Sequence, residues 1–292
     1  MKEHTLQDSI RSWKTMQDAF SSLREERFPY HIHGLSGGIF AFFLAEYVRH
    51  FNANLCIVVP TEKEIEELRA DLDVAGLQAQ VLPWWGNMAY RPVQNSAPVF
   101  AERAQMLAEL CAGAPITDST ASGSAASETA ANTVTVMTQR AFLTPVPPPE
   151  YTASLLFYVH VGLAFDPAAL ADRLVSQGYT RVPRVTVRGE FTLRGEVLDI
   201  FMPGEDYAQR IVFDFDRIES IRSFDCETQT SLGKTDGLLI YPMKETVWTD
   251  ELILKLQNKL AKNEDSCASL IEDLLTAREA EGEEFFYPVV HA

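Results

Sequence analysis

Residues 179–225 read YTRVPRVTVRGEFTLRGEVLDIFMPGEDYAQRIVFDFDRIESIRSFD, and this stretch decides the fold of the second half of the chain. Two of its segments alternate apolar and polar residues with a period of two, which is typical of strands with one buried face. The apolar positions are Phe191, Leu193, Val197, Ile211, Phe213 and Phe215. A tight turn at Asp216-Arg217 would lead into a further strand, Ile218–Phe224. We therefore expect a meander of short antiparallel strands.

The polar side of this meander is rich in arginine. Between residues 179 and 194 a single acid, Glu190, accompanies four arginines, Arg181, Arg184, Arg188 and Arg194. The chain as a whole carries a formal net charge of −16. A local arginine cluster in so acidic a chain favours a partner-binding surface over a merely solvated face.

Composition bounds the class of protein. The chain has 292 residues, of which 46% are hydrophobic and 10% aromatic, so it can build one large or two ordinary domains. The strong negative charge opposes non-specific binding to nucleic acid. The four cysteines form no CxxC pair, and the sequence shows neither a signal peptide nor an apolar run of membrane-spanning length. These features indicate a soluble, cytoplasmic protein without a metal site or cofactor.

The first 150 residues indicate an α/β domain. A short strand at 30–33 leads through Gly34–Gly38 into a buried helix at 39–50. The β-branched run 55–59 predicts a parallel strand covered on both faces, and 133–137 predicts another. Thr61 and Glu64 form the pattern of a capping box at the start of the next helix. Strands that alternate with helices predict a parallel sheet.

The remaining chain divides into two further segments. Residues 112–132 are rich in Ala, Ser, Thr and Gly and predict a flexible insertion in the first domain. Residues 151–232 predict a small α+β domain, with a strand at 154–159 and a helix that begins at Asp166-Pro167. Residues 233–292 predict a strand at 238–241 that returns to the first domain, followed by helices at 251–260 and 269–280. Apolar residues at 285–290 suggest that the sequence is part of a longer protein.

The glycine-rich turn of the first domain lies where a phosphate-binding loop would lie. The working pattern is GxxxxGK[ST], whose lysine neutralises phosphates and whose hydroxyl holds Mg²⁺. Aligned on Gly34, the lysine falls on Phe40 and the hydroxyl on Ala41, and neither can do this chemistry. With Gly37 and Gly38 these residues form a degenerate loop, which favours a structural turn over a nucleotide site.

Three other groups of residues have a functional and a structural interpretation, and we favour the structural one for each. His31 and His33 could bind a metal but have no acidic or cysteine partners nearby. An aromatic loop could stack bases, and turn carboxylates could act in catalysis. These residues are Trp84, Trp85, Tyr90, Asp199, Asp214, Asp216 and Asp225.

Several motifs resemble a known family. The runs Gly189–Gly195, Leu198–Phe201 and Glu219–Asp225, with Thr228-Gln229, resemble the second domain shared by the excision-repair helicase subunit UvrB and the transcription-repair coupling factors. The degenerate loop selects the coupling factors, because UvrB keeps the lysine. A second pattern, Pro83-Trp84-Trp85…Tyr90…Ser96-Ala97-Pro98…Arg103…Leu107, is also similar to theirs, although Gly86 replaces their usual acid.

The resemblance implies a fold, a partner and contact residues. It implies a domain like those of P-loop NTPases with a degenerate loop, into which the small α+β domain is inserted. It implies that the second domain recruits UvrA, the damage-recognition ATPase, and that RNA polymerase and double-stranded DNA bind regions beyond residue 292. The family's contact residues fall on Arg181, Arg194 and Phe201, beside Arg184 and Arg188. UvrB has a further arginine where this chain has Thr192.

The sequence therefore predicts a non-catalytic adaptor that binds UvrA. One alternative is an active, ATP-dependent UvrB-like helicase module, which Phe40 and Ala41 oppose. Another is a module that binds DNA directly, which the net charge of −16 opposes.

Overall fold

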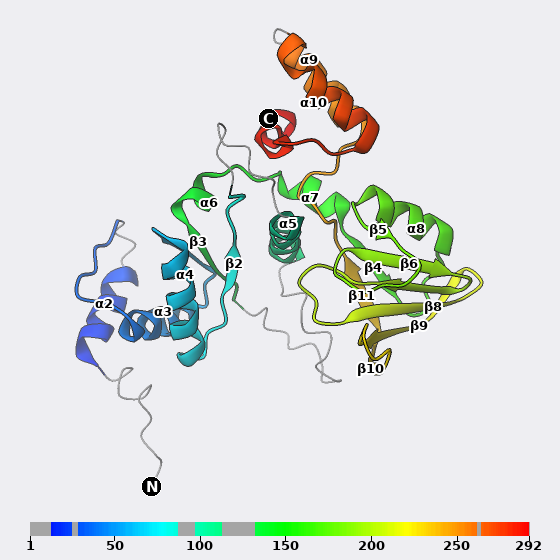
Figure 1. Cartoon of the computed structure of the whole chain (residues 1–292). Coiled ribbons are helices and arrows are strands. Elements are labelled where there is room, and N and C mark those ends of the chain that lie inside the picture. Colours follow the sequence, from blue (N-terminus) through cyan, green and yellow to red (C-terminus); the bar gives the residue numbers. More distant parts are fainter. Residues whose placement is uncertain (1–12, 25–28, 87–96, 113–131, 262–263, 292) are drawn as a thin grey trace. The chain divides into compact units, whose positions relative to one another are not determined.

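The computed structural model describes residues 13–24, 29–86, 97–112, 132–261 and 264–291. The chain forms two compact units, which are described separately. Unit 1 comprises residues 1–82 and 129–143, and unit 2 comprises residues 83–128 and 144–292. The predicted insertion at 112–132 lies almost wholly outside the described residues. Tyr90 also lies outside them. The molecule has mixed α/β architecture with both parallel and antiparallel sheets (Figure 1).

Unit 1 contains a parallel sheet of three strands in the order β1-β3-β2. Its strands are β1 (Leu55–Val59), β2 (Gln80–Leu82) and β3 (Val134–Thr138). All five residues of the central strand β3 are buried, as expected for a parallel strand. In β1 the side chains of Cys56 and Val58, which share one face of the strand, are exposed, so the described residues do not cover that face there. The expectation that β1 is covered on both faces was wrong.

The described residues of unit 1 include four helices. They are α2 (Lys14–Arg24), α3 (Gly38–Phe51), α4 (Glu62–Val74) and α6 (Gln139–Leu143). The predicted cap of α4 is confirmed, since the Thr61 hydroxyl accepts a 3.3 Å hydrogen bond from the N–H of Glu64. Helices α3 and α4 pack on the sheet with α2, and Phe20, Phe43 and Leu72 lie in their shared core. The predicted strand at 30–33 is absent, and these four residues are exposed, so no neighbour covers either face.

Unit 2 is built on a sheet of six strands in the order β10-β9-β8-β7-β6-β5. The strands are β5 (Thr180–Arg181), β6 (Glu190–Arg194), β7 (Val197–Ile200), β8 (Ala208–Asp214), β9 (Arg217–Phe224) and β10 (Ser231–Thr235). Strands β6 to β10 form the predicted antiparallel meander, and β5 joins its edge in parallel. One face of this sheet, here called the inner face, packs on α8 (Pro167–Ser176) through Leu170 and Leu174, which are fully buried.

The turns of the meander differ from the predicted ones, and the faces of two residues change with them. Val197 pairs with Arg194 across the β6–β7 turn, so it shares the face of Arg194 rather than that of Phe191. At the next hairpin Asp214 pairs with Arg217, which puts Phe215 and Asp216 in the turn. Phe215 is therefore 81% exposed instead of buried. A turn placed one residue away reverses the face of a side chain because strands have a period of two.

The ends of the sheet domain also differ from the prediction. The segment expected as a strand at 154–159 begins with helix α7 (Pro149–Leu155), and the strand β4 (Phe157–His160) follows it. β4 pairs antiparallel with β11 (Gly237–Ile240). Strand β11 therefore closes the domain that β4 opens and does not return to unit 1. The predicted boundary near residue 232 falls within strand β10, inside one compact unit.

A separate hydrophobic cluster in unit 2 joins the C-terminal helices to the start of the unit. Helices α9 (Asp250–Leu260) and α10 (Glu264–Ala277) form an antiparallel pair beside η2 (Glu283–Phe286) and α11 (Tyr287–His291). Helix α5 (Ala97–Ala112) contributes Phe100 to this cluster. Of the apolar segment at 285–290, Tyr287 and Val290 are buried, each only 1% exposed, whereas Phe285 is 38% exposed.

Candidate partner-binding site

The predicted contact residues lie at one side of the six-stranded sheet. Arg181 is in the edge strand β5, Arg194 ends β6, and Phe201 directly follows β7. Arg184 and Arg188 lie in the segment that connects β5 to β6. All five residues therefore belong to the β5–β7 part of the sheet, but Arg194 lies at the opposite end of β6 from Phe201.

Arg181 and Arg194 project from opposite faces of the sheet. Arg181 aligns with Phe191, whose ring lies in the core of the inner face. Arg194 is three residues farther along β6, so alternation turns it to the other face, here called the outer face. Both side chains are exposed, and neither makes a hydrogen bond or ion pair within the described part of the chain. Two charged, rigid forks are thus available to a partner on either side of the β5 edge.

The other three predicted residues have partners within the chain. The Arg188 Nε donates a 2.8 Å hydrogen bond to the carbonyl of Glu205, and its guanidinium lies 5.6 Å from the Phe201 ring centre. The Arg184 guanidinium donates to the carbonyl of Cys226 at 3.2 Å. Phe201 is half-buried against a small cluster that includes Phe224. These residues hold the rim of the outer face in place and also contribute to its surface.

The sequence pattern missed a row of residues across the outer face. Thr192 of β6 aligns with Asp199, then with Arg210, then with Arg222. Thr192 and Asp199 are each only 3% exposed, although the alternation placed Thr192 on a wet face. Neighbouring residues cover this part of the outer face, so the polar side chains there are buried.

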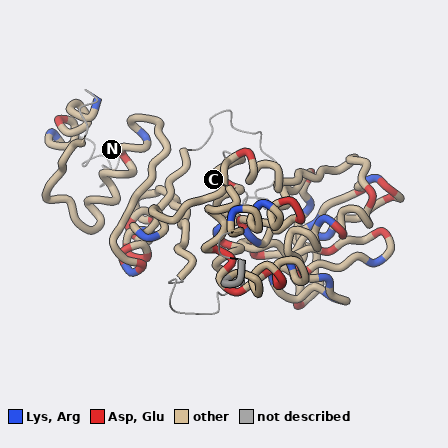
Figure 2. Tube along the Cα trace, turned by 90° about the horizontal axis from the view of Figure 1, so that it is seen from above, with Lys and Arg blue, Asp and Glu red and all other residues tan. Residues whose placement is uncertain are grey.

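Arg210 is the centre of this row. Its Nε and a terminal nitrogen donate to the two oxygens of Asp199 at 2.7 and 2.8 Å, and its guanidinium stacks 4.5 Å from the Phe224 ring centre. Arg222 is its direct cross-strand neighbour, and like charges in that position repel. Asp199 compensates that repulsion. Unit 2 carries both basic and acidic positions (Figure 2).

Two carboxylates of the predicted motifs have structural roles. The Glu190 carboxylate accepts hydrogen bonds from the N–H groups of Thr186 and Val187 at 2.7 and 3.0 Å, which fixes the connection between β5 and β6. Partial burial opposes ionisation, but these hydrogen bonds prevail and the pKa of Glu190 is lowered. Hydrogen bonds from the Thr228 N–H above all lower the pKa of Asp225, which caps the turn after β9. Neither arrangement indicates catalysis.

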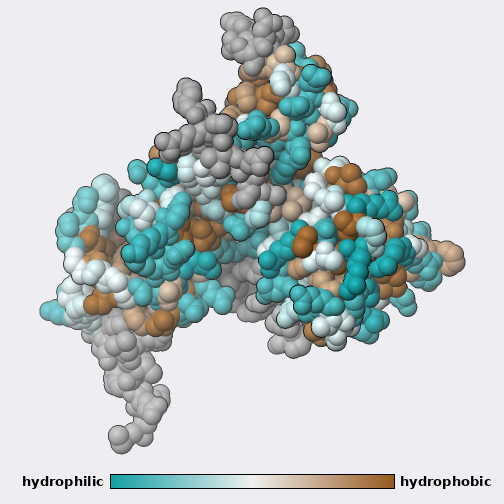
Figure 3. Space-filling view, in the orientation of Figure 1, coloured by the Kyte–Doolittle hydropathy of each residue, from teal (hydrophilic) through white to brown (hydrophobic). Residues whose placement is uncertain are grey.

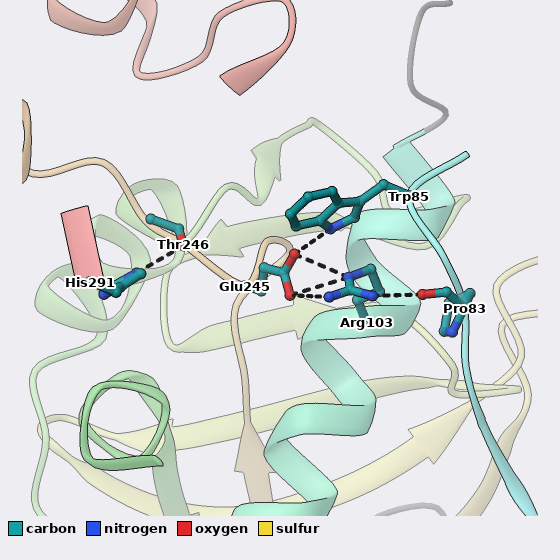
Figure 4. Close-up of polar contacts among 6 residues, drawn as sticks. All are labelled: Pro83, Trp85, Arg103, Glu245, Thr246 and His291. Carbon is teal, nitrogen blue, oxygen red and sulfur yellow. Dashed lines mark hydrogen bonds and ion pairs between the residues drawn. The ribbon is translucent and has the colours of Figure 1, made fainter. Parts of the chain in front are cut away.

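The aromatic pattern around residue 85 is explained by a buried ion pair (Figure 4). The guanidinium of Arg103, on α5, donates to both oxygens of Glu245 at 2.9–3.2 Å and to the carbonyl of Pro83 at 2.7 Å. The indole N–H of Trp85 also donates to Glu245, and the ring lies 5.0 Å from the Arg103 guanidinium. Both charged side chains are completely buried. Trp85 is thus a structural residue, as expected, and it is not available for base stacking.

The turn at the start of α3 offers no phosphate chemistry. Gly34 and Gly37 adopt positive φ, and Gly38 begins the helix. Phe40 packs against the core of unit 1 and Ala41 is completely buried within it. Both side chains therefore face the protein interior. In a working loop the lysine and the hydroxyl at these two positions would instead contact the phosphates and Mg²⁺.

Within the described residues no group of three or more His, Cys, Asp or Glu side chains has the arrangement that a metal ion needs. His31 and His33 are exposed. Within the same residues no helix is both long and apolar enough to span a membrane.

Comparison with known proteins identifies first a class of domain. Residues 157–245 match the family described as the UvrB interaction domain. The match begins at β4 and ends at Glu245, so it includes β11 and reaches the residue that holds Arg103. It coincides with the sheet domain that carries Arg181, Arg194 and Phe201.

The curated relatives include transcription-repair-coupling factors and UvrABC system protein B. The chain is 26% identical over 258 residues, 87% of its length, to the transcription-repair-coupling factor of Borreliella burgdorferi, and covers 21% of that protein. It is 39% identical over 116 residues, 40% of its length, to the same factor of Myxococcus xanthus, and covers 10% of it. UvrABC system protein B of Kosmotoga olearia is 42% identical over 95 residues, 32% of this chain and 14% of that protein. The chain thus spans about a fifth or less of these relatives, and the predicted resemblance to the UvrB-like module of coupling factors is confirmed.

Proposed function

We propose that the sheet domain of unit 2 binds UvrA. The chain is then the UvrB-like module through which a transcription-repair coupling factor recruits UvrA to sites of stalled RNA polymerase. The observation that carries this proposal is the match of residues 157–245 to the UvrB interaction domain, folded here as a compact sheet with unpaired arginines at its edge.

The proposed contact surface is the β5 edge of the sheet together with both its faces. Arg181 and Arg194 are its charged contacts, and Phe201, Arg184 and Arg188 lie toward the start of β6, away from Arg194. Strand β5 has two residues and lies at the edge of the sheet. A partner segment that lies along this edge can therefore contact the inner and the outer face. Arginine suits such a surface because its planar fork pairs with carboxylates in a bidentate manner and stays charged.

The proposal also holds that this module does no chemistry of its own. We regard unit 1 as a domain related to P-loop NTPases whose loop has lost nucleotide binding. The inward position of Phe40 and Ala41 supports this, because neither the lysine nor the hydroxyl of a working loop has a counterpart. In the full-length protein an ATP-driven DNA translocase, with sites for RNA polymerase and double-stranded DNA, would lie outside residues 1–292, in the cytoplasm.

Two titrations test the proposal. The chain should bind purified UvrA, and excess UvrB should displace it because both carry the same interaction domain. Mg²⁺-ATP should produce no binding signal in calorimetry up to millimolar concentration. Absence of UvrA binding would refute the recruiting role, and micromolar ATP binding would favour an active helicase module instead.

A further inference from the structure

The turn between β8 and β9 carries an unusual residue. Phe215 is 81% exposed and adopts a φ of 56°, in the left-handed region. Bulky side chains rarely occupy that region, and hairpin turns of this length usually place Gly, Asn or Asp there. The ring buries almost no surface against its own domain. The fold would therefore be served equally well, or better, by a small polar residue.

The chain holds this turn firmly despite its strain. Asp214 pairs with Arg217 across it, and the carbonyl of Asp216 accepts a 2.6 Å hydrogen bond from the N–H of Phe165. In Figures 1 and 3 the end of the sheet with this yellow hairpin turn projects from unit 2, and its tip is hydrophobic. The aromatic ring is thus presented on a fixed support rather than on a loose loop.

The same turn lies next to the candidate site. The N–H of Phe213 donates a 2.8 Å hydrogen bond to the carbonyl of Glu196, in the β6–β7 turn that directly follows Arg194. Strands β7 and β8 are antiparallel neighbours, so the turn after Arg194 and the turn at Phe215 lie at the same end of the sheet. Neighbouring strands lie about 4.8 Å apart, so the two turns are separated by two or three strand spacings across the sheet, and Phe215 lies three residues beyond Val212, which is level with Arg194. One partner surface of ordinary size covers both.

We propose that Phe215 is an aromatic anchor of the UvrA interface, inserting into an apolar pocket of UvrA beside the groups that pair with Arg194. This inference rests on the proposed function and extends its contact surface to the β8–β9 turn. Aromatic and arginine side chains are enriched at the energetic centres of interfaces. A single exposed apolar residue needs no explanation by itself. Here the exposure coincides with a strained backbone, a rigid support and a neighbouring unpaired arginine.

The residues beside Phe215 indicate which groups should surround the proposed pocket of UvrA. The flanking carboxylates of Asp214 and Asp216 are exposed, so basic or neutral groups should rim the pocket on that side. Arg194 requires acidic groups on the other side. The partner surface is thus an apolar depression between a basic and an acidic rim.

The test is UvrA binding by Phe215→Asn, with Phe142→Asn as the matched control. Asparagine tolerates the left-handed conformation, so the hairpin should persist and the melting temperature should not fall. Phe142 is 58% exposed and lies in unit 1. We expect Phe215→Asn to weaken UvrA binding at least tenfold, mainly through faster dissociation, and the control to stay within twofold of the unmodified chain. Phe215→Tyr should retain most of the affinity.

The possible outcomes distinguish the role of Phe215 from the proposed UvrA-binding function. If Phe215→Asn binds like the unmodified chain while Arg194→Ala binds weakly, Phe215 lies outside the interface and the proposed function stands. If the unmodified chain does not bind UvrA, both fall. Should Phe215→Asn lower the melting temperature, Phe215→Gly replaces it, because glycine adopts positive φ freely.

Discussion

Arg181 and Arg194 stand on opposite faces of the same sheet, on adjacent strands, and neither has a partner in the described part of the chain. Side chains that share no partner and no face contribute independently to binding. A partner that contacts both must therefore wrap the β5 edge, and this arrangement distinguishes the site from a flat patch of charge.

We predict that Arg181→Ala and Arg194→Ala each weaken UvrA binding and that their effects add. Each loss should be about 2–5 kcal/mol if the arginine is desolvated in the complex, which is at least about 25-fold in affinity. The double variant should show the sum to within about 0.5 kcal/mol. Arg69→Ala, on an exposed face of α4, is the control. Losses no larger than that of the control would place the contact surface elsewhere.

Removing one partner of the buried Arg103–Glu245 ion pair should strongly destabilise unit 2. Glu245→Ala leaves a completely buried guanidinium without its counter-charge, and this should lower the free energy of unfolding by about 3–5 kcal/mol. Urea denaturation followed by tryptophan fluorescence measures the change. The control is Glu279→Ala, whose carboxylate is 68% exposed and lies 3.4 Å from Lys244, and its effect should stay below about 1 kcal/mol. Equal effects of the two variants would contradict the prediction.

The Asp199–Arg210 pair should be strongly coupled in a double-mutant cycle. We expect Asp199→Ala and Arg210→Ala to give a coupling free energy of about 1.5–3 kcal/mol, because the pair is bidentate and Asp199 is nearly buried. The pair Arg188–Asp206, at 3.5 Å with side chains 52% and 86% exposed, is the comparison. It should couple by less than about 1 kcal/mol. A coupling that vanishes at Asp199–Arg210 would mean that solvent screens the pair.

The sequence predicted what depends on local patterns. The alternation at 190–194 correctly predicted a strand, and the caps at Thr61 and Asp166 correctly predicted two helix starts. These signals depend only on residues within a few positions of each other. The position of the β8–β9 turn was wrong by one residue, which reversed the face of Phe215. Turn type depends on pairing across the hairpin, and apolar alternation alone does not record it.

Long-range relationships could not be predicted in this way. Glu245 lies 142 positions from Arg103, and no local spacing connects them. The same limit explains why β11 was placed in the first domain rather than beside β4. Thr192 was predicted to be wet because it is polar, whereas it is covered on the outer face next to Asp199. A polar pattern indicates a solvated face only where nothing else packs on that face.

A buried carboxylate next to the candidate site should make stability depend on pH. Glu205 is only 5% exposed, and its Oε1 has no hydrogen-bond partner in the described part of the chain. Burial above all, and then the neighbouring carboxylates of Asp206 and Glu109, raise its pKa from 4.5 to about 7, although Arg188 partly offsets them. Helix α5 brings Glu109 close, since Gly204 packs directly on the side chain of Gln105.

The sign of the effect follows from where the proton binds more tightly. The folded state holds the Glu205 proton up to about pH 7, whereas the unfolded chain releases it near pH 4.5, so stability falls as pH rises between these values. At pH 8 the charged carboxylate should cost the fold about 3 kcal/mol relative to acidic conditions. Glu205→Gln removes the ionisation and nearly preserves the shape, so it should raise the free energy of unfolding at pH 8 and change it little at pH 5. The control is Glu219→Gln, an exposed residue of β9, which should leave the pH dependence unchanged. Urea titrations at pH 5, 6, 7 and 8 provide the comparison, and parallel curves for the Glu205→Gln variant and the unmodified chain would show that Glu205 is not the group that titrates.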